Sequence, residues 1–406
     1  MRRIKLLTIL TLALFTQVEG HAQYFSSRAE ISLITCSPGS ELYSVFGHSA
    51  IRVNDSTSGT DLIFNYGVFD FNTPNFYWKF IKGKLQYRLA IQRMDNFVRA
   101  YAAEGRSIKE EKLRLTQEEK RRIISFLRNN YRPENRYYLY DFFYNNCSTK
   151  IWDVAEGQID DSLMFDTSVY MARSFRDLLY IYLDDVPWSK LGIDLLLGMP
   201  ADKIASFKQQ MYLPDFLSRN MSYTYRLDSS GSKQQLMAPE EVILKKNEAL
   251  SGVEKPFFTP VVVFTLVGIV LAAITFWGGK RFKRWLDAAL LLIIGLLGVL
   301  LLFMWSATNH QQMDWNLNLL WANPLGLVFF YFAVRNQMSR AGVVYAIILV
   351  FLAFNLVGWA WLPQHLNLSL VPLLIAFVIR GVDNVFPDCC PFARLRKKQQ
   401  TFPLKD

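Results

Sequence analysis

The hydrophobic and polar positions of this chain follow two different patterns, and the change comes near residue 255. Before that point, apolar and charged residues are mixed as in a globular domain. After it, apolar runs of the length that an α-helix needs to cross a bilayer dominate. We therefore predict a mixed domain at 23–225, a polar linker at 226–255, a helical membrane domain at 256–388 and a basic tail at 389–406.

The membrane part contains five apolar runs that are candidate spans. They are 257–277, 286–305, 317–334, 343–362 and 366–386, of which the third and the fifth are interrupted by Pro324, Pro372 and Asp383. Lys and Arg gather at 280–284, 335–340 and 394–398, whereas the intervening loops 306–316 and 362–367 contain neither. By the positive-inside rule, this alternation predicts an odd number of spans, with the mixed domain outside and the C-terminus in the cytoplasm.

The chain starts with the pattern of a secretory signal. Arg2, Arg3 and Lys5 precede a short apolar core at 6–15, and Gly20-His21-Ala22 places small residues before a cleavage point. We predict a signal peptide at 1–22. An uncleaved anchor is the alternative, and it would export the following domain equally.

Three segments of the mixed domain alternate between polar and apolar residues, which predicts β-strands at 28–35, 48–53 and 62–68. His48 lies on the second strand and Asn65 on the third. A histidine on one strand and an asparagine on the next can be placed to orient an imidazole. The type of structure at 85–101 is left open by its pattern.

Two helix starts are marked by capping residues. Thr116 is followed by Glu119, which is the pattern of a capping box. Asn146 is a candidate N-cap for a helix that begins at Cys147. Further apolar helices are predicted at 174–183 and 191–199, so the domain belongs to the α+β class.

A cysteine in the first turn of a helix faces free backbone N–H groups and the positive end of the helix dipole, and both favour the reactive thiolate. Cys147 is therefore our candidate nucleophile, with His48 as its base and Asn65 as the group that orients the imidazole. Glu41 or Tyr43 are alternatives for this third role. The simpler reading of Cys147 is a small buried residue at a helix start.

Other chemistries are less well supported by the sequence. The net charge of +10 comes largely from residues beside apolar runs, which favours membrane topology over nucleic-acid binding. Only His48, His310 and His365 remain after the signal, and they are far apart, so we expect no metal and no cofactor. A disulfide between Cys36 and Cys147 is an open alternative. Cys389 and Cys390 fit a juxtamembrane position without chemistry.

The outer loop at 308–318 is dense in hydrogen-bonding groups. It ends with Asn316 and Asn318 and runs into the third span at Asn323-Pro324. Buried amides at this place could bind lipid headgroups or cap the ends of helices, and the sequence favours neither.

Three motifs carry a resemblance to a known family. Phe46-Gly47-His48-Ser49, Phe64-Asn65-Tyr66-Gly67 and Asn145-Asn146-Cys147-Ser148 resemble the periplasmic domain of the Lnb-type lipoprotein N-acyltransferases. The resemblance continues through the outer-loop motif at 316–325. The order of histidine before cysteine is similar to that of circularly permuted papain-like (NlpC-type) thiol enzymes, so the resemblance implies this fold for the domain.

The resemblance implies a two-step acyl transfer at the outer face of the cell's inner membrane. Cys147 would take an acyl chain from a membrane phospholipid as a thioester, and the N-terminal cysteine amine of a diacylglyceryl lipoprotein would then accept it. His48 would move the protons. Candidate substrate contacts are Tyr140, Tyr144, Asn146, Asn316 and Asn318. A papain-like peptidase or amidase, or a membrane scaffold without catalysis, are the alternatives.

Overall fold

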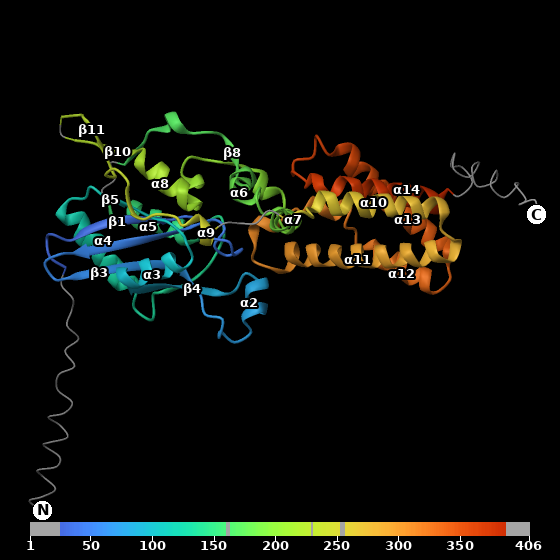
Figure 1. The fold of residues 1–406 in the computed structure, drawn as a ribbon, viewed down its shortest axis with the longest axis horizontal. Coiled ribbons are helices and arrows are strands. Elements are labelled where there is room, and N and C mark those ends of the chain that lie inside the picture. Colours follow the sequence, from blue (N-terminus) through green and yellow to red (C-terminus); the bar gives the residue numbers. More distant parts are fainter. Residues whose placement is uncertain (1–24, 160–162, 229, 252–255, 387–406) are drawn as a thin grey trace, which may run out of the picture.

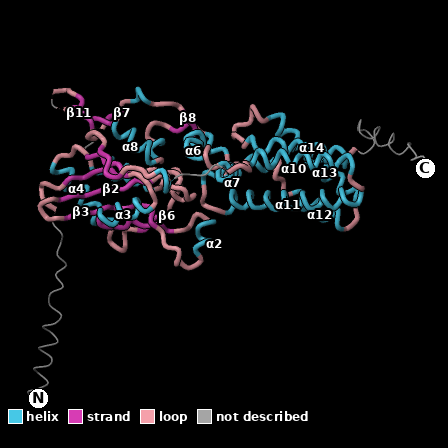
Figure 2. Tube along the Cα trace, in the orientation of Figure 1, coloured by secondary structure: helices cyan, strands magenta, loops and turns pink. Residues whose placement is uncertain are grey.

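The computed structural model describes residues 25–159, 163–228, 230–251 and 256–386. Figure 1 shows two parts, an N-terminal domain of mixed structure and an elongated helical bundle. Figure 2 shows that every strand lies in the first part. The predicted signal peptide at 1–22 and the basic tail with Cys389 and Cys390 lie outside the described residues.

The N-terminal domain is built on a seven-stranded antiparallel sheet with the strand order β12-β5-β1-β2-β3-β4-β6. Its strands are β1 (Glu30–Cys36), β2 (His48–Asp55), β3 (Thr60–Val68), β4 (Gln86–Arg93), β5 (Ile108–Lys112), β6 (Tyr137–Leu139) and β12 (Glu241–Leu244). Smaller sheets consist of β7 (Met164–Phe165), β10 (Thr224–Leu227) and β11 (Lys233–Gln235), and of β8 (Arg173–Ser174) and β9 (Ile204–Ala205). The three strands expected from alternation are confirmed as β1 to β3.

The structure goes beyond the sequence-based expectation at 85–101 and differs from it at 226–255. The segment 85–101, whose secondary structure the sequence pattern leaves open, forms β4 and the helix α3 (Met94–Ala103). The segment expected to be a polar linker at 226–255 instead contributes strands, and β12 pairs with β5 at the edge of the main sheet. The folded domain therefore extends at least to Leu244. β5 lies more than a hundred residues before β12 in the chain, so the pairing of the two strands cannot be predicted from the local sequence.

Helices cover the sheet and connect it to the membrane part. They are α2 (Phe76–Ile81), α3, α4 (Gln117–Asn130), α5 (Cys147–Gln158), α6 (Phe175–Leu183), α7 (Pro187–Leu196), α8 (Pro214–Ser222) and α9 (Glu248–Ser251), with short 3₁₀ turns η1 (Thr167–Val169), η2 (Met199–Asp202) and η3 (Gln209–Tyr212). The capping box of Thr116 and Glu119 is present at the start of α4. The second predicted apolar helix begins earlier than expected, because Pro187 occupies the first turn of α7.

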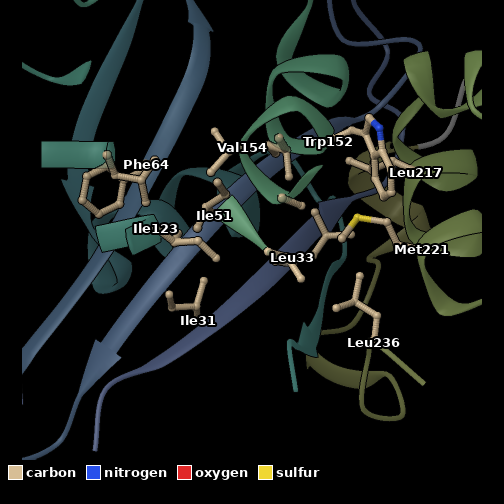
Figure 3. Packing of buried hydrophobic residues seen from close by; sticks show 14 of the residues in the cluster. Ile31, Leu33, Ile51, Phe64, Ile123, Trp152, Val154, Leu217, Met221 and Leu236 are labelled. Atoms are coloured by element: carbon tan, nitrogen blue, oxygen red, sulfur yellow. The ribbon is translucent and has the colours of Figure 1, made fainter. Parts of the chain in front are cut away.

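The helix that carries Cys147 is packed onto the face of the sheet. Trp152 and Val154 of α5 belong to one buried cluster with Leu33 of β1 and Ile51 of β2 (Figure 3). Burial of such side chains contributes on the order of 1.5–3 kcal/mol each. The start of α5 is thereby held at a fixed position relative to the strands.

The C-terminal bundle contains α10 (Pro260–Trp277), α11 (Lys280–Ala307), α12 (Leu325–Val334), α13 (Met338–Gly358) and α14 (Val371–Val385), with η4 (Gln311–Met313), η5 (Leu317–Leu320) and η6 (Leu368–Leu370). Within the described residues, four helical segments are long and apolar enough to cross a membrane, with mean hydropathies from 1.7 to 2.8. A fifth span exists if the pair Gln311–Leu320 and Leu325–Val334, which is bent by 45°, is counted as one. The interruption predicted for the third apolar run is confirmed at this bend.

Both loops that lack Lys and Arg face the N-terminal domain. The side-chain amide of Asn316 donates to the backbone carbonyl of Leu195 at 2.7 Å, and that of Asn367 donates to the Asp194 carboxylate at 2.8 Å. The C-terminal end of the described chain lies at the opposite end of the bundle (Figure 1). This arrangement agrees with the side that the positive-inside rule assigns to each loop.

A buried ion-pair network supports the junction of the two parts. Arg176 is fully buried and pairs with Asp194 at 2.8 Å and with Asp202 at 2.9 Å. Asp202 in turn contacts Nδ1 of His365 from an outer loop at 3.0 Å. The network therefore joins α6 and α7 to the loop before α14.

We expect Arg176→Ala to destabilise the protein by about 3–5 kcal/mol, because two buried carboxylates would lose their cation. Thermal unfolding of the detergent-solubilised full chain measures this effect. Lys208→Ala is a matched control, since Lys208 forms an exposed ion pair with Glu156 and should change stability by less than about 1 kcal/mol. Equal effects of the two substitutions would contradict the role of the network.

Candidate active site

A tight turn places His48 at the beginning of β2. Gly47 adopts a φ of +80°, and a Cβ at this position would lie 2.7 Å from the carbonyl oxygen of Cys36. Only glycine fits both the left-handed conformation and the close approach of β1. The Phe46-Gly47-His48 sequence thus fixes where the imidazole emerges from the sheet.

The imidazole of His48 is held by the neighbouring strand. Nε2 of His48 lies 3.1 Å from Oδ1 of Asn65, which is buried in β3. A carbonyl oxygen only accepts hydrogen bonds, so Nε2 carries the proton and Nδ1 is left for the thiol. The structure therefore places Asn65 beside the histidine, and among the described residues neither Glu41 nor Tyr43 forms a hydrogen bond with His48.

Cys147 is the first residue of α5, and the start of this helix is fixed by several contacts. Asn146 caps the helix by accepting hydrogen bonds from the backbone N–H groups of Ser148 at 2.8 Å and Thr149 at 3.0 Å. The Ser148 hydroxyl lies 3.1 Å from that of Ser49 on β2. These contacts confirm the predicted cap and tie the helix start to the strand that carries His48.

Gly67 lies beside the start of the helix that carries Cys147. It lies on β3 with a φ of +86°, and a Cβ at this position would approach that of Cys147 to 3.5 Å. Gly67 ends the Phe64-Asn65-Tyr66-Gly67 motif, which by itself predicts no role for the glycine. Gly67 lies next to Cys147 because α5 packs on the sheet, and this packing cannot be predicted from the local sequence.

The ionisation of Cys147 and His48 is coupled. Burial of the Cys147 thiol disfavours the thiolate, but the charge of His48, its hydrogen bond and the backbone N–H of Ser49 outweigh burial and lower the pKa of the thiol below 9.0. Burial likewise disfavours the imidazolium, but the thiolate and the hydrogen bond of Asn65 raise the pKa of His48 above 6.5. The arrangement favours a thiolate–imidazolium pair, which is the activated form of a cysteine nucleophile.

Cys36, the other cysteine of the domain, has a raised pKa, in contrast to Cys147. Cys36 and Cys147 are both free thiols, so the disulfide alternative is not supported. Cys36 is completely buried, and burial raises its pKa to about 12. At neutral pH it is therefore a protonated core residue.

The two tyrosines that we considered as substrate contacts lie in different surroundings. Tyr140 stacks on Tyr87 with ring centroids 4.3 Å apart, and burial followed by the nearby Cys147 raises its pKa well above 10. Tyr144 is 41% exposed and packs on Phe143 and Phe175. Of the pair, Tyr140 is the one whose pKa is affected by the charge of Cys147.

The three asparagines considered as substrate contacts have their donors engaged within the protein. The Asn146 amide donates to the carbonyls of Phe142 and Tyr212, both at 2.8 Å. The amides of Asn316 and Asn318 donate to backbone carbonyls at the end of α7, with distances of 2.7–3.3 Å. Of the two roles that the sequence left open for the outer-loop amides, helix capping is the one present. These side chains fix the structure and offer no free amide hydrogen to a lipid.

Asn65→Ala should lower the pKa of His48, because the hydrogen bond that favours the imidazolium is lost. With the imidazole less well oriented, we expect the activity of the site to fall by up to about a hundredfold. The alkaline limb of the pH–rate profile should move to lower pH, which reports the His48 pKa directly. Asn65→Asp, which keeps an acceptor at this position, is the matched comparison, and an unchanged profile in Asn65→Ala would contradict a positioning role.

Comparison with protein families gives two matches along the chain. Residues 16–179 match the Lnb N-terminal periplasmic domain, and residues 252–388 match the Lnb transmembrane domain. No curated protein and no solved structure matches the chain. The two family matches agree with the α+β domain and the apolar helical bundle described above.

Proposed function

The chain belongs to the Lnb family as a multi-pass membrane protein with an N-terminal periplasmic domain, and from this premise we propose that it is a lipoprotein N-acyltransferase. The acyl donor is a membrane phospholipid, and the acceptor is the N-terminal cysteine amine of a diacylated lipoprotein. One observation carries the proposal. A thiol with a lowered pKa lies beside an oriented histidine in a domain that is joined to membrane-spanning helices.

In the first step, the Cys147 thiolate attacks the ester carbonyl of the phospholipid. The tetrahedral intermediate collapses to a thioester, the ester C–O bond breaks, and the imidazolium of His48 gives its proton to the leaving alkoxide. The product of this step is a lysophospholipid. Asn65 keeps the imidazole aligned throughout.

In the second step, the lipoprotein amine attacks the thioester. An amide bond forms, the C–S bond breaks, and His48 accepts the proton that the amine loses. The Cys147 thiolate and the imidazolium are thereby restored. No other reactant is required, because the energy of the ester is kept in the thioester.

The negative charge of each tetrahedral intermediate needs a hydrogen-bond donor. In the first turn of α5, the N–H groups of Ser148 and Thr149 already donate to Asn146. The backbone N–H of Cys147 itself has no acceptor within the described part of the chain. We assign the oxyanion contact to this group, supported by the positive end of the helix dipole.

The family and the loop charges support a placement in the inner membrane, with the thiol domain in the periplasm and the C-terminus in the cytoplasm. The permuted papain-like fold remains part of this proposal. It rests on the order of His48 and Cys147 and on the packing of the cysteine helix against the histidine strand.

The direct assay supplies the purified full chain with phospholipid that carries labelled acyl chains and with a diacylated lipopeptide. We expect a triacylated lipopeptide and one lysophospholipid for each transferred chain. Cleavage of the peptide portion, with no acyl transfer, would instead favour the peptidase or amidase alternative. Absence of both reactions would contradict an enzymatic function.

A further inference from the structure

The helix α2 presents an apolar surface that the rest of the described chain leaves largely exposed. None of its six residues is buried, and Tyr77, Trp78 and Phe80 are 75%, 53% and 51% exposed. A helix this short is not stable by itself in water. A contiguous exposed patch of large apolar residues usually marks a contact with a partner or a membrane.

This helix is attached to the outer end of a membrane-spanning helix. Trp78 stacks on Phe303, which lies near the end of α11, with ring centroids 6.0 Å apart. The backbone N–H of Asn309 donates to the carbonyl of Lys82 at 3.0 Å, and Nε2 of His310 donates to that of Phe80 at 3.1 Å. Figure 1 shows α2 beside this end of the bundle. Its aromatic side chains therefore lie where the bilayer surface meets α11.

The charges around α2 suit the headgroup region of a bilayer. Lys79 lies between Trp78 and Phe80, and Lys82 and Lys84 follow them in the sequence. Nζ of Lys82 lies 4.7 Å from the centre of the Trp78 ring. Trp and Tyr are the residues that accumulate at both membrane–water interfaces. The lysine ammonium groups can reach phosphates while the rings remain in contact with acyl chains.

A row of aromatic rings leads from α2 to Tyr140, in the segment that precedes Cys147. Successive centroid distances are 6.3, 5.8, 5.2 and 4.3 Å for the pairs Phe80–Phe76, Phe76–Phe69, Phe69–Tyr87 and Tyr87–Tyr140. The charge of Cys147 contributes to the raised pKa of Tyr140, so the row ends in the neighbourhood of the thiol. The chain itself follows a similar route. Residues 69–84 come shortly after Gly67, where a Cβ would lie 3.5 Å from that of Cys147.

We propose that residues 69–84, the aromatic arm, take up the donor phospholipid from the outer leaflet of the membrane that α11 spans. The lysines contact the phosphate, and an acyl chain lies along the rings towards Cys147. This inference rests on the proposed function for its last step, the delivery of the ester to the thiol. The contact between the aromatic arm and lipid does not depend on that step.

The contact is tested by photocrosslinking in the full chain reconstituted in phosphatidylethanolamine and phosphatidylglycerol vesicles. We expect a benzoylphenylalanine at position 77 to crosslink to phospholipid at least tenfold more than one at position 242. Val242 is also exposed, at 53%, but it lies on β12, at the edge of the sheet opposite to β6. Equal labelling at both positions would overturn the proposal.

The delivery is tested with the double variant Tyr77→Ser/Phe80→Ser, whose side chains are mostly exposed, with Val242→Ser as the control. We expect thioester formation on Cys147 from phospholipid vesicles to fall about tenfold or more, while formation from a water-soluble short-chain thioester stays within twofold. Equal rates of variant and wild type with vesicles would refute delivery by the aromatic arm. If the wild type forms no thioester from either donor, the proposed function fails, and the crosslinking result alone decides the lipid contact.

Discussion

Cys147→Ser should lower the rate of acyl transfer by at least about a thousandfold. A serine hydroxyl has a far higher pKa than a thiol, so the His48 imidazole can no longer hold the nucleophile as an anion. The side chain remains nearly the same in size, and the start of α5 is fixed by Asn146 and Ser148 rather than by the sulfur. The loss should therefore occur without unfolding. The labelled phospholipid assay measures the rate, and thermal unfolding verifies the fold.

The matched control is Cys36→Ala. Cys36 is buried, and its pKa is raised to about 12, so it does not supply a thiolate at neutral pH. We expect this variant to keep its transfer activity even if removal of the sulfur reduces stability. Full activity in Cys147→Ser, or loss of activity only in Cys36→Ala, would remove Cys147 from the mechanism.

His48→Ala should raise the pKa of Cys147 above its value in the wild type. In the wild type, burial of the thiol is outweighed first by the charge of His48 and then by its hydrogen bond. Without the imidazole, burial becomes the dominant effect, and burial favours the neutral thiol. We also expect acyl transfer to fall by roughly 10²–10⁴-fold, as for the loss of a general acid–base group.

Alkylation of Cys147 by iodoacetamide across a pH range measures this shift in the detergent-solubilised chain. The midpoint should lie below 9.0 in the wild type and move upward in His48→Ala. His365→Ala is the control for loss of a histidine, because His365 contacts Asp202 at the junction with the membrane bundle. A midpoint that is the same in all three proteins would show that His48 does not influence the thiol.

The same ionisations define the pH range of the reaction. The acid limb of the pH–rate profile should follow the lowered pKa of Cys147, below which the thiolate is protonated. The alkaline limb should follow the raised pKa of His48, above which the proton for the leaving alkoxide is lost. The rate should therefore be highest between these two values and fall on both sides.

The parts of the site that depend on local sequence could be predicted. Polar and apolar alternation located β2 and β3, and hence His48 and Asn65 on neighbouring strands. The N-cap preference of asparagine located the start of α5 at Cys147. Strand periodicity and helix capping act within a few residues, which is why they can be read from one chain.

The remaining features depend on contacts between distant segments. Three contacts join residues that are far apart in the sequence. They are the pairing of β12 with β5, the ring contact of Trp78 with Phe303, and the hydrogen bonds of the outer-loop amides to the end of α7. A polar stretch can be a linker or an edge strand, and an amide can bind a ligand or cap a helix. The sequence leaves both possibilities open, because the partner that decides between them is not local.

The most direct measurement of the central claim is the intact mass of the full chain after incubation with phospholipid. The account predicts an increase equal to one acyl group, located on Cys147 by peptide mapping and removed when a diacylated lipopeptide is added. An unmodified Cys147 under conditions in which the lipopeptide does become acylated would contradict it.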